Sequence, residues 1–234
     1  SLLRNRLRTT LTITGIGIGI AAVICTAALG AAGATRVQQQ MDALGEDFLW
    51  IRAGNRNVAG LRTGFGGART LKADDATALV ANVPQIASCS PVGSGRQQVI
   101  AGGQNWNTRY QAVLPSYFQI RRRVAGAGSL FADADVANTA KVIVLGSSVA
   151  ARLFGDQPAV GRVVRMNRFP FEVIGVLSSR GSGAGGADRG DAVFVPATTA
   201  DQYLDRRDWV SDIMCGVRSP DVMDAVEVQA TSLL

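Results

Sequence analysis

Histidine is absent from all 234 residues of the sequence. Because imidazole is the usual base beside serine and cysteine nucleophiles and a frequent metal ligand, its absence excludes Ser-His-Asp and Cys-His pairs and all His-ligated metal sites. Cysteine is scarce as well, and the three cysteines include no Cys-x-x-Cys pair of the zinc or thioredoxin type. We therefore predict no catalytic, cofactor-binding or metal-binding residues, no cofactor and no enzymatic activity.

Charge is missing from one long stretch near the N-terminus. Residues 9–35 carry no charged side chain, whereas the chain beyond them carries charges at an ordinary density for a soluble domain. Residues 11–34 number 24, and about 20 helical residues cross the core of a bilayer. Arg4, Arg6 and Arg8 precede the stretch, so the positive-inside rule predicts a cytoplasmic N-terminus and a main domain outside the cytoplasm.

The same stretch has a competing interpretation as a secretory signal peptide, with residues 32–34 (Ala-Gly-Ala) as the cleavage site. The apolar run is longer than the 7 to 15 residues typical of signal peptides. Its helical spacing also continues through Val37, Met41 and Leu44 as far as Gly45, a residue type that often ends helices. We expect residues 1–45 to form a transmembrane helix and a stalk.

Two features of the apolar stretch bear on packing. Gly15 and Gly19 form a small-xxx-small pair, which lets two helix backbones approach closely in lipid; simple tolerance of glycine in a membrane helix explains them equally well. Cys25 lies in the same stretch, whereas Cys89 and Cys215 lie in strand-like runs further on. Outside the cytoplasm Cys89 and Cys215 could form a disulfide, although two buried free thiols are the simpler interpretation.

The net charge of +6 does not indicate nucleic acid, because no basic stripe interleaved with aromatic residues is present. Arg121, Arg122 and Arg123 are consecutive and could contact an anionic lipid or substrate, but a solvated strand edge is the default interpretation.

Residues 46–234 mix strand-like and helix-like segments without regular βα alternation, which favours the α+β class. Two hairpins are predicted, one turning at Gly102-Gly103 and one at Asn167-Arg168. Helices are predicted at 72–82, after residue 146 and at 221–234, and further strands at 48–53, 86–92, 141–145, 192–195 and 211–217. We expect two lobes: one formed by residues 46–100 and 197–234, and an inserted one formed by residues 101–196.

Three local patterns imitate functional motifs. Residues 181–186 are rich in glycine but are followed by Ala187-Asp188 rather than the Lys-Ser/Thr of a Walker A loop. Residues 146–148 follow a strand, but they do not complete Gly-x-Ser-x-Gly, and no histidine could activate the serine. The aspartate pairs 133/135 and 188/191 are better explained as solvated loop acids than as cation ligands.

The succession of segments resembles the MacB-type ABC transporter permeases and their periplasmic core domain. The segments that carry the resemblance occur in the expected order and span almost the whole chain: 5–24, 44–45 with 51–54, 144–146 with 149–150 and 153–155, 160–161, 170–171 with 173–177, and 193–196. Each is weak alone, and the order gives the signal its strength.

The resemblance implies a non-catalytic permease component in the bacterial inner membrane, which relays ATP-driven motion to the periplasm for export of drugs, peptides or lipoproteins. It implies as partners a cytoplasmic ABC ATPase, a second copy or paired permease, a periplasmic adaptor and the lipid bilayer. This sequence departs from the family in having Glu46-Asp47 after Leu44-Gly45, and in having no second apolar run of spanning length. We therefore expect a fragment of a four-helix permease. The alternative is an anchored or secreted extracytoplasmic binding domain that takes no part in transport.

Overall fold

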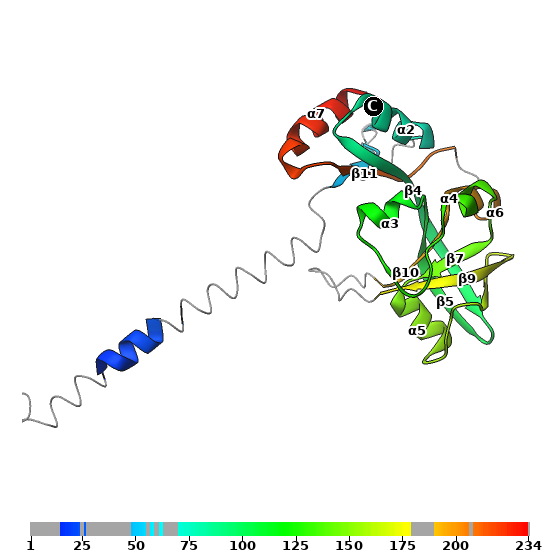
Figure 1. The fold of residues 1–234 in the computed structure, drawn as a ribbon. Helices are drawn as coiled ribbons and strands as arrows, with labels where there is room; N and C mark the ends of the chain where they lie inside the picture. The colour runs from blue at the N-terminus through cyan, green and yellow to red at the C-terminus, as the bar shows by residue number, and fades with distance from the viewer. Residues whose placement is uncertain are drawn as a thin grey trace, which may run out of the picture. The chain divides into compact units, whose positions relative to one another are not determined.

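The structure is a computed structural model, and it describes residues 15–23, 26, 48–54, 57–58, 61–62, 70–178, 190–205 and 208–233. The chain divides into two compact units, residues 1–46 and residues 47–234 (Figure 1). In the first unit, residues 15–23 are helical. Within the described part of the chain, no helix has both the length and the apolarity needed to span a bilayer. Most of the predicted membrane helix and its stalk, residues 11–45, lie outside the described residues, so that prediction stays open.

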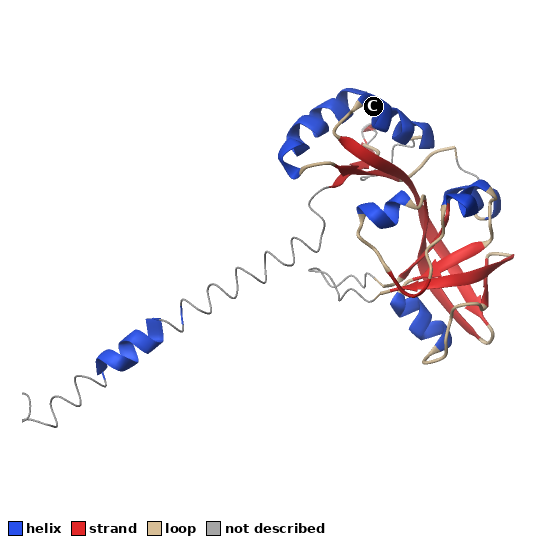
Figure 2. Ribbon diagram, in the orientation of Figure 1, coloured by secondary structure: helices blue, strands red, loops and turns tan. Residues whose placement is uncertain are grey.

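The second unit is built on a mixed sheet of nine strands with helices on its faces (Figure 2). Its order is β1-β11-β4-β5-β10-β7-β9-β6, and β8 pairs with both β4 and β9. The strands are β1 (Phe48–Arg52), β4 (Ile86–Ala101), β5 (Gln104–Val113), β6 (Ala125–Gly128), β7 (Val142–Leu145), β8 (Val163–Met166), β9 (Phe169–Leu177), β10 (Ala192–Pro196) and β11 (Asp212–Val217). A separate two-stranded sheet joins β2 (Asn57–Val58) and β3 (Leu61–Arg62).

The helices are short. They are α2 (Ala73–Asn82), α3 (Ser116–Ile120), α4 (Asp133–Ala137), α5 (Ser147–Phe154), α6 (Ala197–Tyr203), the 3₁₀ turn η2 (Pro220–Val222) and α7 (Met223–Leu233). Parallel pairs (β5 with β10, β7 with β9) and antiparallel pairs occur in the same sheet. The α+β class is therefore confirmed.

Strand β4 connects the two ends of the sheet. Its first half pairs with β11, from Ile86↔Val217 to Val92↔Asp212, and its second half pairs with β5, from Gly93↔Ala112 to Ala101↔Gln104. Gly95 lies beneath the ring of Tyr110: a Cβ at this position would come within 2.6 Å of the ring. The glycines at 93 and 95, which suggest a break between two strands, instead let neighbouring side chains pack closely over one continuous strand.

The predicted hairpins are both confirmed. Ala101 pairs with Gln104 across Gly102-Gly103, and Met166 pairs with Phe169 across Asn167-Arg168, so each turn has two residues. Gly102 has φ of +56° and Asn167 has φ of +58°, the left-handed conformation that such turns require and that glycine and asparagine tolerate. These turns fix the register of the strands that they join.

Three apolar clusters hold the unit together. One lies between α2, α7 and the β1-β11-β4 end, and includes Leu79, Cys215 and Val226. A second packs α5 and Ala200 of α6 against the other end of the sheet. The third is largely aromatic, with Phe118 in ring contact with Phe131 and Phe194 at centroid distances of 5.0 and 5.6 Å. The two-lobe boundaries predicted from the sequence stay a prediction.

We expect Gly175→Ala to destabilise the domain strongly. Gly175 of β9 pairs with Gly128 of β6, and a Cβ at residue 175 would collide with the backbone carbonyl of Ser129. Backbone cannot move aside as a side chain can, so overpacking here should lower the free energy of unfolding by about 1–3 kcal/mol. Gly103→Ala is the matched control, because a Cβ there meets no atom within 4 Å. Urea denaturation of the full chain, followed by tryptophan fluorescence, measures both; equal effects of the two substitutions would contradict the packing described here.

Candidate functional site

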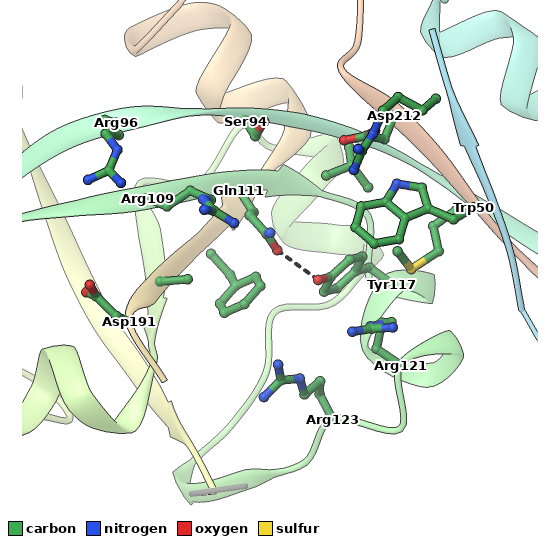
Figure 3. Close-up of a pocket in the computed structure, with 15 residues that line it drawn as sticks. Trp50, Ser94, Arg96, Arg109, Gln111, Tyr117, Arg121, Arg123, Asp191 and Asp212 are labelled. Carbon is green, nitrogen blue, oxygen red and sulfur yellow. Dashed lines mark hydrogen bonds and ion pairs between the residues drawn. The ribbon is translucent and has the colours of Figure 1, made fainter. Parts of the chain in front are cut away.

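A cleft of about 440 Å³ opens on one face of the sheet (Figure 3). Five strands and α3 line it: β1 and β11 on one side, β4 across the middle, and β5 and β10 on the other. Its lining contains five arginines and two aspartates, at positions 52, 96, 109, 121, 123, 191 and 212. The cleft is therefore strongly cationic. Its volume lies within the range of small-molecule sites.

The pleat of the strands explains which residues reach the cleft. Side chains on a strand alternate between two faces, so residues two apart share a face. The lining follows this rule on every strand: positions 50 and 52, 92, 94 and 96, 109 and 111, 192 and 194, 212 and 214. The cross-strand register then brings these pairs side by side, with Ser94 opposite Gln111 and Phe194 opposite Gln111 on the other edge.

Two arginines lie side by side on neighbouring strands of the cleft. Arg96 of β4 and Arg109 of β5 are direct register partners in the antiparallel pair. Both side chains are exposed, and among the residues that the structure describes neither has an ion-pair partner. Like charges directly opposite on neighbouring strands are destabilising. This pair therefore costs the domain some stability.

The two acids of the cleft are already engaged. Asp212 accepts a hydrogen bond from Nε of Arg52 at 2.9 Å, and the same guanidinium lies 4.7 Å from the ring centroid of Trp50. Asp191 accepts hydrogen bonds from Trp106 Nε1 and Thr108 Oγ1, each at 2.8 Å. Neither acid is thus positioned as the counterion of Arg96 or Arg109.

Helix α3 and the turn after it close one side of the cleft. The helix ends in a Schellman arrangement, in which the N–H of Arg123 donates to the carbonyl of Phe118 (2.7 Å) and the N–H of Arg122 donates to that of Gln119 (3.0 Å). Arg122 therefore adopts φ of +46°, a conformation that costs a non-glycine residue about 1–2 kcal/mol. The turn places Arg121 and Arg123 in the lining of the cleft.

Tyr117 of α3 forms part of the cleft floor. Its hydroxyl donates to Gln111 Oε1 at 2.8 Å, which links the helix to β5 (Figure 3). Burial raises the pKa of the Tyr117 phenol above 10.0, and the charges of Arg121, Arg123 and Arg109 act in the opposite direction. The burial effect is the larger, so the phenol stays protonated at neutral pH and remains a hydrogen-bond donor.

The chemistry offered by this site is binding. Guanidinium forks and an amide border one hollow, and such groups donate hydrogen bonds to oxyanions, while the Tyr117 hydroxyl proton is already donated to Gln111. No group of three or more potential ligands (His, Cys, Asp or Glu) that could hold a metal ion occurs in the described part of the chain.

The residues predicted from sequence lie elsewhere. Cys89 of β4 and Cys215 of β11 are register partners with Cα atoms 4.0 Å apart, and the structure joins their sulfur atoms. Gly15 and Gly19 lie on the described helical stretch 15–23, and a Cβ at either would meet no atom within 4 Å. Their role in helix packing remains a prediction.

Of the acidic pairs considered from sequence, Asp133 and Asp135 occupy the first turn of α4, where Asp135 accepts the N–H of Ala132 at 2.8 Å. Asp188 lies outside the described residues. The arginine run was noted in the sequence and two of its members line the cleft, but Arg96 and Arg109 were missed. Only the strand register shows that these two meet, and the spacing Arg109-x-Gln111 was the sole local signal.

Comparison with known proteins gives matches of three kinds: a family profile, curated relatives and solved structures. A family profile described as the MacB-like periplasmic core domain matches residues 9–233. The macrolide export ATP-binding/permease protein MacB of Bdellovibrio bacteriovorus is 35% identical over 229 residues, covering 98% of this chain and 35% of that protein. The periplasmic region of MacB from Actinobacillus actinomycetemcomitans superposes with a TM-score of 0.69 at 21% identity, covering 82% of this chain and 85% of that one.

A second solved structure, the extracellular domain of the ABC-type transporter YknZ from Gram-positive bacteria, gives a TM-score of 0.65 at 17% identity, covering 80% of this chain and 92% of that one. At these identities the two structures establish the fold alone. The chain spans about a third of the length of the curated relatives that it matches, 35% and 36% for the first two. Because the family profile covers nearly the whole chain, the chain belongs to the MacB-like periplasmic core domain family.

Proposed function

We propose that this chain is the first membrane helix and the extracytoplasmic domain of an ABC transporter permease in the bacterial inner membrane. It performs no catalysis and relays ATP-driven motion from the cytoplasm to the outer compartment, for export of drugs, peptides or lipoproteins. The observation that carries the proposal is the extent of the family match, residues 9–233, which takes in the uncharged stretch as well as the folded domain.

The names of the relatives supply the proposed partners. They are called macrolide export ATP-binding/permease proteins, and this chain corresponds to about a third of their length. An ATP-binding part would therefore lie in the remaining two thirds or in a separate subunit. A second copy or paired permease, a periplasmic adaptor and the lipid bilayer complete the proposed set of partners.

The sheet suggests how motion could pass through the domain. We propose two lobes, residues 46–100 with 197–234 and residues 101–196. Strand β4 pairs with β11 through its first half and with β5 through its second, so a single strand runs through both pairings. A strand hydrogen-bonded along its length transmits a displacement better than a loop of similar span.

The second candidate is an anchored or secreted binding domain without a part in transport, and the cleft is the observation that favours it. The gene downstream of residue 234 separates the two candidates, because three further spanning segments indicate a permease. A mature protein that begins at Thr35 would indicate a secreted domain.

We expect alkaline phosphatase fused after Leu234 to be active in bacterial cells, because the enzyme folds only outside the cytoplasm. Replacing Arg4, Arg6 and Arg8 by glutamine should lower the activity per molecule of fusion protein at least several-fold, since cytoplasmic arginines set the orientation. The matched control replaces Arg162, Arg165 and Arg168, three exposed arginines of the folded domain, by glutamine. Low activity of the unaltered fusion would place the domain in the cytoplasm and refute the topology.

We expect Gln39→Pro to uncouple the longer transporter that we propose contains this chain. Proline inside a helix removes a hydrogen bond and costs about 3 kcal/mol, so a stalk through residues 35–45 would no longer be rigid. ATP hydrolysis by the purified transporter should persist, while resistance of cells to a macrolide should fall to the level of a deletion strain. Gln39→Ala should retain both, and equal resistance of the proline variant at equal abundance would rule out a rigid relay.

We expect Cys89 and Cys215 to be bonded in the protein purified from the cell envelope, because the outer compartment is oxidising. Alkylation of the denatured, unreduced chain should add one adduct, at Cys25, and alkylation after reduction should add three. Intact mass measurement counts the adducts. Three adducts before reduction would show two free thiols instead.

A further inference from the structure

We infer that the cationic cleft binds a small oxyanion ligand, a compound with phosphate or carboxylate groups, that bridges Arg96 and Arg109. The phosphate could belong to a soluble molecule or to the headgroup of a lipid. This inference does not depend on transport. It can therefore fail while the proposed function stands, and the proposed function can fail while this inference stands.

The first step concerns the electrostatic repulsion between Arg96 and Arg109. Arg96 and Arg109 oppose each other in register, and within the described residues neither forms an ion pair with an acid. Two guanidinium groups on the same face of neighbouring strands can instead share one oxyanion, each through a pair of parallel N–H···O hydrogen bonds. A bound oxyanion turns the repulsion into two charge-assisted contacts.

The second step concerns the other residues of the cleft that surround Arg96 and Arg109. Arg121 and Arg123 approach the same hollow from the turn after α3, and Gln111 and Tyr117 lie between them and Arg109 (Figure 3). Charges of one sign on the walls of a cleft focus the potential and raise the local concentration of an oppositely charged ligand. The Schellman hydrogen bonds after α3 hold this turn in place with Arg122 at a φ of +46°, and strained residues of this kind cluster at ligand sites.

The third step concerns the acids and the size of the cleft. Asp212 is paired with Arg52, and Asp191 is held by Trp106 and Thr108, so neither acid competes for the central arginines. A volume of about 440 Å³ accommodates a ligand of the size of pyrophosphate or citrate together with water. The many polar side chains of the lining favour a charged ligand over an apolar one.

The position of the cleft gives binding a consequence. One wall belongs to β1 and β11, the other to β5 and β10, and β4 forms the middle. A ligand that bridges Arg96 and Arg109 contacts the middle strand and one wall, and would hold β4 and β5 together at this point of the sheet. Binding would therefore stiffen the domain at the strand through which, as we propose, motion passes.

The experiment uses the full chain in phosphatidylcholine nanodiscs and isothermal titration calorimetry at low ionic strength. The probes are pyrophosphate, citrate and the short-chain lipid dihexanoyl phosphatidic acid, with dihexanoyl phosphatidylcholine as the zwitterionic match of the lipid. We expect at least one anionic probe to bind, with an affinity that falls as salt is raised. Binding of pyrophosphate or citrate identifies a soluble ligand, and binding of phosphatidic acid alone identifies a lipid headgroup.

The test variant is Arg96→Gln with Arg109→Gln, which should weaken the affinity at least tenfold. The matched control is Arg165→Gln with Arg168→Gln on the β8–β9 hairpin, which removes the same charge from exposed positions outside the cleft and should change the affinity less than twofold. Binding of no anionic probe by the unaltered chain, or equal weakening by the two double variants, overturns the inference.

Thermal denaturation gives a second readout that a merely structural role would not produce. Without ligand, Arg96→Gln should unfold at the same or a higher temperature than the unaltered chain, because it relieves the repulsion of the pair. It should also lose most of the rise in unfolding temperature that the bound probe causes in the unaltered chain. A lower unfolding temperature without ligand would show that Arg96 is a structural residue and would overturn the inference.

Discussion

The fold depends on one strand that has two sets of partners. In β4 the backbone hydrogen bonds pass from β11 to β5 between Val92 and Gly93, without an interruption in the strand. The pairing with β11 ties the sheet to α2 and α7, and the pairing with β5 ties it to α5 and the parallel strands. A shift of β4 by one residue would reverse every side chain between the core and the cleft. Its register is fixed by the turn at Gly102-Gly103 at one end and by the alignment of Cys89 with Cys215 at the other.

The cleft follows from this register. Because Val92, Ser94 and Arg96 alternate with residues that face away, the same pleat that buries Val99 in the core places Arg96 on the opposite face, in the cleft. Strands β1, β11, β5 and β10 then add their own alternate residues to that face. The strands of the sheet therefore form most of the cleft, and α3 with the turn at Arg122 supplies the rest.

Much of the fold could be predicted from the sequence, because its signals are local. Two-residue turns with glycine or asparagine predict both hairpins, and α5 lies where a helix is predicted after residue 146, ending at Gly155 with φ of +60°. The helices α3, α4 and α6 were not predicted. Each has five to seven residues, too few to show a helical period, and tertiary contacts hold them, such as the ring contacts of Phe118 on α3.

The cleft could not be predicted for a related reason. Arg96 and Arg109 are separated by a hairpin, and only the number of residues in its turn decides whether they meet or pass each other. Asp191 and Asp212 join them from strands about a hundred residues further on. The consecutive arginines at 121–123 were visible, but the sequence suggested a solvated edge, because the left-handed backbone at Arg122 carries no sequence signature when the residue is not glycine.

The charges of the cleft also limit what the domain can be. A fold under selection for stability alone would place an acid opposite Arg96 or Arg109, since a single substitution would replace repulsion by an ion pair. The acids that are present accept hydrogen bonds from Arg52, Trp106 and Thr108 instead. Such an arrangement satisfies its acids locally and leaves two arginines side by side, and the three apolar clusters hold the domain together in spite of their repulsion. The pair includes a residue of β4, the strand shared by both pairings of the sheet, and a bound anion of the kind that we infer would remove the repulsion there.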